Sequence, residues 1–115
     1  MFPKKHRLSK SADVKKTTAR GRSFFNKYFV IKSVPQNDEK KFTVVVSTKI
    51  SKKAVERNRI KRIVREELRI NIDNIKTGSY VFLIKPLALK IESKELRSEL
   101  FKSLTIAKII KTSPN

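Results

Sequence analysis

The sequence has no cysteine and no tryptophan, and its 115 residues include one histidine, two glycines and four prolines. Without cysteine the chain forms neither disulfides nor thiolate metal sites, which suits a reducing compartment, and we expect the cytoplasm. Two glycines are too few for a glycine-rich phosphate loop. No apolar run approaches the roughly 20 residues that a membrane-spanning helix needs, and no apolar signal segment follows the first charges. We therefore expect no membrane partner.

Side chains for catalysis are scarce as well. The single histidine, His6, lies near the start of the chain, where a lone imidazole is usually solvated. A two-metal nuclease needs several carboxylates that converge on ions about 4 Å apart. The acidic residues here are scattered, and the adjacent Glu66 and Glu67 point in different directions on a helix. No serine has a histidine partner at a plausible place, so we expect no catalytic residue and no metal site of the protein's own.

Negative charge is rare: ten Asp and Glu stand against 29 Lys and Arg, which gives a formal net charge of +19. The cations run from Lys4 to Lys111 and are not confined to a tail. Such a charge repels itself in the folded state unless a polyanion compensates for it. Nucleic acid is the polyanion that we expect, because its phosphates release counterions when cations bind them. An acidic membrane surface is the other polyanion of this kind, and it has little support in the sequence.

A chain of this length forms one domain with one hydrophobic core. We expect the domain to span residues 1–115, with a basic arm at 1–8 and a disordered tail at 111–115. Apolar periodicity and turn residues predict helices at 9–20, 54–70 and 93–108, and strands at 24–32, 42–48 and 80–84. The first two strands flank the turn-forming residues 35–38 and are predicted to pair antiparallel. The order α-β-β-α-β-α predicts a small α+β sandwich in which helices cover one sheet.

The first predicted strand is apolar on both faces. Side chains alternate along a strand, so one face would carry Phe25, Phe29 and Ile31, and the other would carry Phe24, Tyr28 and Val30. We expect one face to pack on the core. The other face either presents rings to nucleic-acid bases, which stack at about 1–3 kcal/mol each, or is covered by further helices. The sequence leaves both possibilities open.

The predicted helix at 54–70 has an apolar back and a cationic front, at about 100° per residue. The back carries Ile60, Ile63, Val64, Leu68 and Ile70, and the cationic front carries Asn58, Lys61, Arg62, Arg65 and Arg69. Arg57 and Arg59 flank this front on opposite sides. A run of charge on a helix is usually a solvated face, but here no acid neutralises the front. Because guanidinium groups suit bidentate phosphate contacts, the pattern favours binding to nucleic acid.

The same segment resembles a known signature. It reads Ala54-Val55-x-Arg57-Asn58-Arg59-Ile60-Lys61-Arg62-x-x-Arg65-Glu66, which is similar to the signature of the bacterial ribonuclease P protein family. Further matches are His6-Arg7-Leu8, Gly21-Arg22-Ser23, Val45-Val46-Ser47 with Lys49, and Lys85-Pro86. The resemblance therefore covers most of the chain. It implies an α+β fold with a left-handed strand-helix-strand crossover.

The resemblance also implies a function. The protein would be the non-catalytic subunit of an RNA-based endoribonuclease that removes the 5′ leader from precursor tRNA. The catalytic RNA subunit would carry out the hydrolysis with Mg²⁺ that it binds itself. The implied partners are this RNA and the leader of precursor tRNA, and the protein would be a monomer in a 1:1 complex with the RNA.

The implied binding residues form two groups. The RNA subunit would contact Arg57, Asn58, Arg59, Lys61, Arg62 and Arg65, with Arg69 from the same front. The leader would lie in a cleft between the sheet and two helices, lined by Val14, Thr18, Phe25, Phe29, Lys32, Ser47 and Lys49. Many members of the family carry aromatic residues where this chain has Val14, Thr18 and Lys32. We therefore expect weaker stacking at these places and a larger contribution from Phe25, Phe29 and charge.

Two other classes of binding protein share the basic charge. A ribosomal protein or an RNA chaperone would bind RNA structurally and would need no leader cleft. A duplex DNA-binding protein would place the helix at 54–70 in the major groove to read base edges, yet its front offers only the amide of Asn58 besides cations. Composition does not separate these classes. The signature does, and it favours ribonuclease P.

Overall fold

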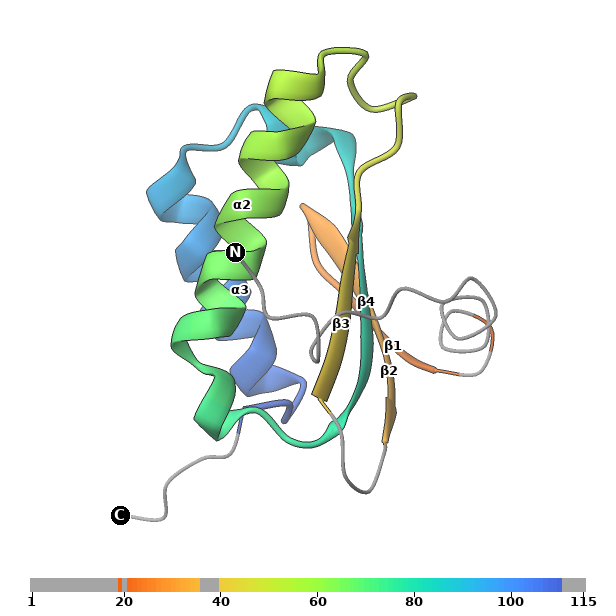
Figure 1. Ribbon diagram of the computed structural model, residues 1–115, viewed down its shortest axis with the longest axis vertical. Coiled ribbons are helices and arrows are strands. Elements are labelled where there is room, and N and C mark those ends of the chain that lie inside the picture. The colour runs from red at the N-terminus through yellow and green to blue at the C-terminus, as the bar shows by residue number, and fades with distance from the viewer. Residues whose placement is uncertain (1–18, 20, 36–39, 111–115) are drawn as a thin grey trace.

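A computed structural model of the protein describes residues 19, 21–35 and 40–110. The strands are β1 (Arg22–Phe25), β2 (Phe29–Pro35), β3 (Lys40–Val45) and β4 (Gly78–Ile84); the helices are α2 (Ala54–Ile70) and α3 (Ser93–Ile106), with the short 3-10 helices η2 (Ile72–Asn74) and η3 (Pro86–Leu89). Figure 1 shows both long helices on one side of a single sheet. The predicted α+β class is confirmed. Apart from Ala19, the helix predicted at 9–20 lies outside the described residues, as do the predicted arm and tail.

The segment predicted as one strand at 24–32 is a hairpin. Asn26 makes the turn between β1 and β2: its backbone N–H donates to the carbonyl oxygen of Phe29 (2.9 Å), and its side-chain Oδ1 accepts from the N–H of Tyr28 (2.8 Å). Asparagine favours such turns because its side chain can bond to the backbone two residues later. The turn changes the predicted faces, since Phe24 now pairs with Ile31 and Phe25 pairs with Val30.

The sheet has the strand order β1-β2-β4-β3. β4 lies in the middle, antiparallel to β2 and parallel to β3, so the predicted antiparallel pairing of the segments 24–32 and 42–48 was wrong. Neighbouring parallel strands need a long crossover connection, and α2 is that connection between β3 and β4. β4 suits the central position because all but one of its seven residues are buried.

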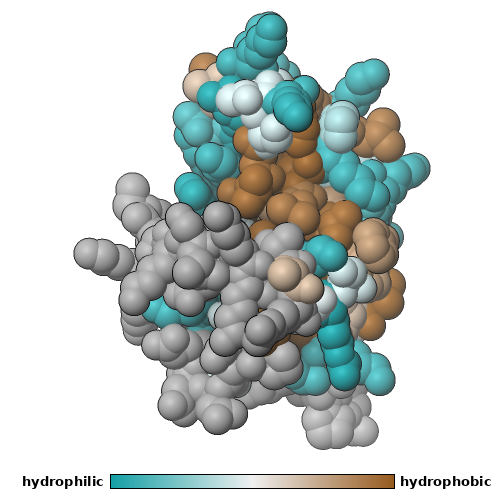
Figure 2. Space-filling view, turned by 90° about the vertical axis from the view of Figure 1, so that its right-hand side faces the viewer, coloured by the Kyte–Doolittle hydropathy of each residue, from teal (hydrophilic) through white to brown (hydrophobic). Residues whose placement is uncertain are grey.

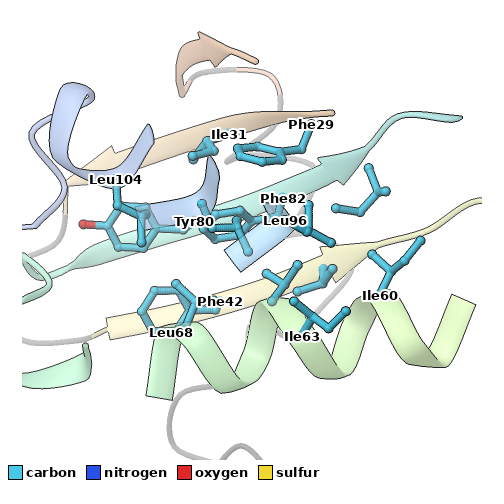
Figure 3. Close-up of a cluster of buried hydrophobic side chains, with 14 of the residues drawn as sticks. Phe29, Ile31, Phe42, Ile60, Ile63, Leu68, Tyr80, Phe82, Leu96 and Leu104 are labelled. Carbon is cyan, nitrogen blue, oxygen red and sulfur yellow. The ribbon is translucent and has the colours of Figure 1, made fainter. Parts of the chain in front are cut away.

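The core lies between the sheet and the two helices. Figure 3 shows the inward side chains of β2, β3 and β4 facing those of α2 and α3. The fully or almost fully buried members include Phe29, Ile31, Phe42, Phe82, Ile60, Val64, Leu68, Leu96, Leu100 and Leu104. The predicted apolar back of the helix at 54–70 is confirmed at four of its five positions. The exception is Ile70, which is 59% exposed because it is the last residue of α2, directly before Asn71 ends the helix.

Candidate nucleic-acid interface

The cationic front of α2 faces solvent. Asn58, Arg62, Arg65 and Arg69 are exposed, and Lys61 is half-buried. The helix keeps these side chains in fixed relative positions, so a polyanion meets an ordered row of donors rather than a flexible tail. The three carboxylates of α2 have partners away from this front: Glu56 accepts from Ser51, Glu66 pairs with Arg97, and Glu67 accepts from Asn71. The front therefore presents positive charge without a neutralising acid from its own helix.

Arg57 is held against the loop that precedes α2. Its Nη1 donates to the carbonyl oxygen of Ser51 at 2.8 Å. Ser51 is itself buried, and its hydroxyl donates to Glu56 at 3.0 Å and accepts from the backbone N–H of Lys53 at 3.2 Å. A guanidinium group has five N–H donors, so this contact orients Arg57 and still leaves donors for a phosphate.

Arg59 points to the opposite side of the front, toward α3. Its Nη1 donates to the hydroxyl of Ser93, the first residue of α3, at 2.9 Å. Two turns further along α2, Glu66 pairs with Arg97 of α3 at 3.1 Å. These two contacts join the helices side by side. The predicted placement of Arg57 and Arg59 on opposite flanks of Asn58 agrees with this geometry.

The second candidate surface is the outer face of the sheet, opposite the helices. One row of side chains crosses all four strands there, and we call it the apolar row: Phe25, Val30, Leu83 and Val45. Phe25 is 69% exposed and Val45 is 38% exposed. Figure 2 looks onto the sheet from this side and shows an apolar area bordered by hydrophilic residues. Val30 and Leu83, the middle members of the row, are half-buried. A partly exposed apolar row in a chain of such high charge is a candidate binding surface.

Lys32 adds a cation beside this row. Its Nζ donates to the hydroxyl of Ser23 and lies 6.0 Å from the centre of the Phe25 ring. An ammonium group at this distance is attracted by the face of an aromatic ring. None of the four strands contains an aspartate or glutamate. The outer face therefore combines an exposed ring, apolar side chains and positive charge, which suits a single-stranded nucleic acid.

The two surfaces meet at the loop between β3 and α2. Ser47 follows Val45 by two residues, and its Oγ accepts from the N–H of the exposed Lys49 at 3.0 Å. The chain then reaches Ser51, to which Arg57 is bonded. The apolar row thus leads toward the beginning of the cationic front through this loop.

The predicted leader cleft needs one correction. Phe29 is fully buried in the core, with 0% exposure, so its ring cannot contact a ligand on the outer face. Its place is explained by the hairpin, which puts Phe29 on the helix side of β2. Phe25, Lys32, Ser47 and Lys49 have accessible side chains, and Val14 and Thr18 lie outside the described residues.

The sequence did not indicate that Val30, Leu83 and Val45 share a face with Phe25 in the apolar row. Alternation along each strand marks these positions as sharing a face with their second neighbours. Only the pairing register places these residues side by side, and the register depends on which strands pair. Because β4 separates β2 from β3, no local pattern brings these residues together.

Within residues 19, 21–35 and 40–110, no group of three or more His, Cys, Asp or Glu side chains is arranged to hold a metal ion. In the same part of the chain, no helix is both long enough and apolar enough to cross a membrane.

The chain is similar to proteins of one family. The sequence model described as Ribonuclease P matches residues 2–108. The ribonuclease P protein component of Listeria innocua is 33% identical over 120 residues, which cover 97% of this chain and 96% of that protein. The component of Desulforapulum autotrophicum is 37% identical over 103 residues, with 88% and 87% covered.

Solved structures give the same result. The ribonuclease P protein of Staphylococcus aureus superimposes with a TM-score of 0.87 at 27% identity and covers 92% of this chain and 98% of its own. The ribonuclease P protein of Thermotoga maritima has a TM-score of 0.77 at 28% identity, with 87% and 96% covered.

Proposed function

The chain belongs to the ribonuclease P protein family, and we propose that it binds both the RNA subunit of ribonuclease P and the 5′ leader of precursor tRNA. Membership makes it a protein component of a ribonucleoprotein endoribonuclease that acts in tRNA processing, with ribonuclease P RNA as its partner. The observation that carries the proposal is the continuity of the two surfaces. An acid-free helix front and an apolar, cation-bordered sheet face meet at the loop between β3 and α2.

The RNA subunit binds the cationic front. Arg62, Arg65 and Arg69 contact its phosphates through exposed guanidinium groups, and Asn58 and Lys61 precede them on the same front. Arg57 and Arg59 extend the contact to both flanks. Each phosphate neutralised releases counterions, which makes the binding tight and dependent on salt.

The leader binds along the outer face of the sheet as an extended single strand. Phe25 supplies a stacking ring, and Lys32, Ser47 and Lys49 supply cationic and polar contacts at the two ends of the apolar row. Val14 and Thr18 complete this cleft by the resemblance to the family. A four-stranded sheet of this size accommodates about two or three stacked bases.

The chemistry belongs to the RNA subunit and to the Mg²⁺ that the RNA binds. The protein reduces the repulsion between two polyanions and positions the leader, as one RNA-binding domain in a 1:1 complex in the cytoplasm. Its net charge of +19 supports this role, because cations between two RNA molecules offset their mutual repulsion.

Cleavage of precursor tRNA at low Mg²⁺ by a bacterial ribonuclease P RNA tests the function. The reaction is run with the RNA alone, with the protein alone, and with both. We expect stimulation only when both are present, because the protein lowers the repulsion that Mg²⁺ otherwise screens. Cleavage by the protein alone would contradict the assignment of the chemistry to RNA. Tight RNA binding without stimulation would favour a ribosomal protein or an RNA chaperone instead.

A further inference from the structure

An open surface pocket of about 330 Å³ lies at the end of the β1–β2 hairpin, between the turn and α3. We call it the hairpin cavity; its polar lining is Lys27, Tyr28, Glu95, Ser98, Glu99 and Lys102. α2 contributes no residue to this lining, so the cavity is separate from the cationic front. Its volume lies at the lower end of the range for small-ligand sites, about 300–1,000 Å³.

Hydrogen bonds of Asn26 hold the hairpin turn against α3 beside the hairpin cavity. The Nδ2 of Asn26 donates to the hydroxyl of Ser103 at 3.2 Å and to the carboxylate of Glu99 at 3.4 Å, which ties the turn to α3. The Oδ1 of Asn26 accepts from the backbone N–H of Tyr28. The Tyr28 ring also packs against the core. The backbone around the hairpin cavity is therefore held by the fold, while the side chains of Lys27, Glu95, Ser98 and Lys102 are exposed to solvent.

The lining matches the parts of a nucleotide. Tyr28 offers an aromatic ring, with the Nζ of Lys27 lying 5.5 Å from its centre. Lys102, 3.9 Å from the carboxylate of Glu99, brings a second cation for a phosphate. Carboxylates accept hydrogen bonds from the exocyclic amine of cytosine, and adenine carries an amine of the same kind. Uracil presents a carbonyl oxygen at the corresponding position, which a carboxylate repels.

The hairpin cavity also continues the path of the outer face. Phe25, at the end of the apolar row, is separated from Lys27 only by Asn26. Because Asn26 makes a turn, Phe25 and Lys27 lie closer together than about 7 Å, the span of two residues of fully extended chain. A strand of RNA that leaves the Phe25 ring reaches the cavity by passing around the end of the hairpin.

We propose that the hairpin cavity binds one nucleotide of the leader, upstream of the nucleotides on the sheet, and that it prefers cytosine or adenine over uracil. The base replaces the ammonium group of Lys27 over the Tyr28 ring, stacks there, and donates its exocyclic amine to Glu95 or Glu99. Lys27 and Lys102 contact its phosphate. This inference rests on the proposed binding of the leader to the outer face, and it adds a second site with its own base preference.

Competition between precursor tRNAs in one reaction of the reconstituted holoenzyme tests the proposal. One substrate has a short leader of about three nucleotides, enough for the sheet alone. Two others have longer leaders whose upstream nucleotides are all cytosine or all uracil. We expect the long cytosine leader to exceed the short leader in kcat/KM by roughly fivefold or more, the lower limit for stacking of one base. We expect it to exceed the uracil leader by roughly fivefold.

Variants separate the hairpin cavity from general charge. Lys27→Ala combined with Lys102→Ala removes two cations of the lining, and the control pair Lys90→Ala with Lys94→Ala removes two exposed lysines beside it. We expect the first pair to abolish the higher kcat/KM of the long cytosine leader over the short leader, and the control pair to retain this difference. Glu95→Gln lowers the preference for cytosine over uracil. Equal losses in both lysine pairs, or equal rates for the two long leaders in the unmodified protein, would overturn the proposal.

Phe25→Ala distinguishes this proposal from the function on which it rests. If the leader lies on the outer face, the substitution lowers kcat/KM for the substrate with the short leader. Suppose that Phe25→Ala lowers kcat/KM for the short-leader substrate, while the cavity variants do not change kcat/KM for the long-leader substrates. This result would exclude binding at the hairpin cavity and would leave the proposed function intact. When Phe25→Ala leaves the short leader unchanged, the proposed path of the leader fails. Thermal unfolding of each variant shows that the fold is intact.

Discussion

Gly78, the first residue of β4, is placed where any larger residue meets its neighbours. A Cβ atom at this position would lie 3.0 Å from the hydroxyl of Tyr80 and 3.0 Å from the carbonyl oxygen of Val34. This carbonyl oxygen is part of the backbone of β2, the strand paired with β4, so it cannot move far from the added Cβ atom. We predict that Gly78→Ala lowers the free energy of unfolding by about 1–3 kcal/mol, measured by urea denaturation. Thr77→Ala, at an exposed neighbour, is the control, and equal stability of the two variants would contradict the prediction.

Tyr80 gives the fold a dependence on alkaline pH. Burial raises the pKa of Tyr80 to about 12, and its hydroxyl donates to the carbonyl oxygen of Lys76 at 2.6 Å. Because the folded pKa exceeds the unfolded value of about 10, the stabilisation is complete below pH 10 and is lost as the pH rises toward 12.

Tyr80→Phe tests this dependence. At neutral pH we predict a loss of about 1 kcal/mol in the free energy of unfolding, because the hydrogen bond to Lys76 is removed. The difference from the unmodified protein should shrink as the pH rises from 10 to 12, since only the unmodified protein has this phenol to ionise. Urea denaturation at several pH values measures it, and a constant difference would contradict the linkage.

The helix α2 shows what a sequence predicts well. Its bounds of Ala54–Ile70 agree with the predicted range, because the periodicity of apolar and cationic residues is local to the segment. The hairpin shows the opposite case. Asn26 forms the turn within a run of aromatic and β-branched residues, and those residues predict one continuous strand. One turn-forming residue was not enough to predict the turn, because the residues around it have high β-strand propensity.

The front of α2 determines the salt dependence of RNA binding. Arg57 is bonded to Ser51, so the exposed Arg62 and Arg65 are the cleaner sites for substitution. We predict that Arg62→Ala with Arg65→Ala weakens binding to the RNA subunit and lowers the salt slope by about one for each lost phosphate contact. Binding titrations over a range of KCl concentrations measure the slope. The control pair Lys90→Ala with Lys94→Ala removes the same amount of charge. An equal salt slope for both pairs would show that the cationic front does not contact the RNA subunit.

A strained residue, Lys108, follows the end of α3. Lys108 has a φ of 59°, and the N–H groups of Ile109 and Ile110 that follow both donate to the carbonyl oxygen of Leu104, at 2.9 and 3.2 Å. This conformation costs a residue with a Cβ about 1–2 kcal/mol, and glycine avoids the cost. We predict that Lys108→Gly raises the midpoint of thermal unfolding. Lys108→Ala keeps the Cβ and is the control, so a similar gain in Lys108→Ala would contradict the prediction.

At the scale of the whole molecule, the strand order is what the sequence could not provide. The position of β4 between β2 and β3 joins residues that are about 50 positions apart in the chain, as in the pair of Val30 with Leu83. Such pairings depend on the burial of the whole sheet and not on any local pattern. The cationic front was therefore predicted from one helix, whereas the apolar row emerged only with the assembled sheet.

Charge is distributed unevenly over the same molecule. Every acidic residue in the described part of the chain, Glu56, Glu66, Glu67, Asp73, Glu92, Glu95 and Glu99, lies outside the four strands. Within the described residues, the sheet and the front of α2 therefore carry positive charge and no acidic residue, and this charge repels itself when the protein is free and is neutralised when RNA binds.

This distribution predicts opposite effects of salt on the free protein and on the complex. The Debye length falls from about 30 Å at 0.01 M salt to about 10 Å at 0.1 M, so KCl screens the repulsion among cations of the free protein. We predict that its midpoint of thermal unfolding rises over this range, measured by circular dichroism. The affinity for the RNA subunit falls over the same range, because each counterion that is released gains less entropy when the bulk salt concentration is higher. A midpoint that stays constant or falls would show that the fold itself compensates the charge, and RNA would then bind without relieving any repulsion.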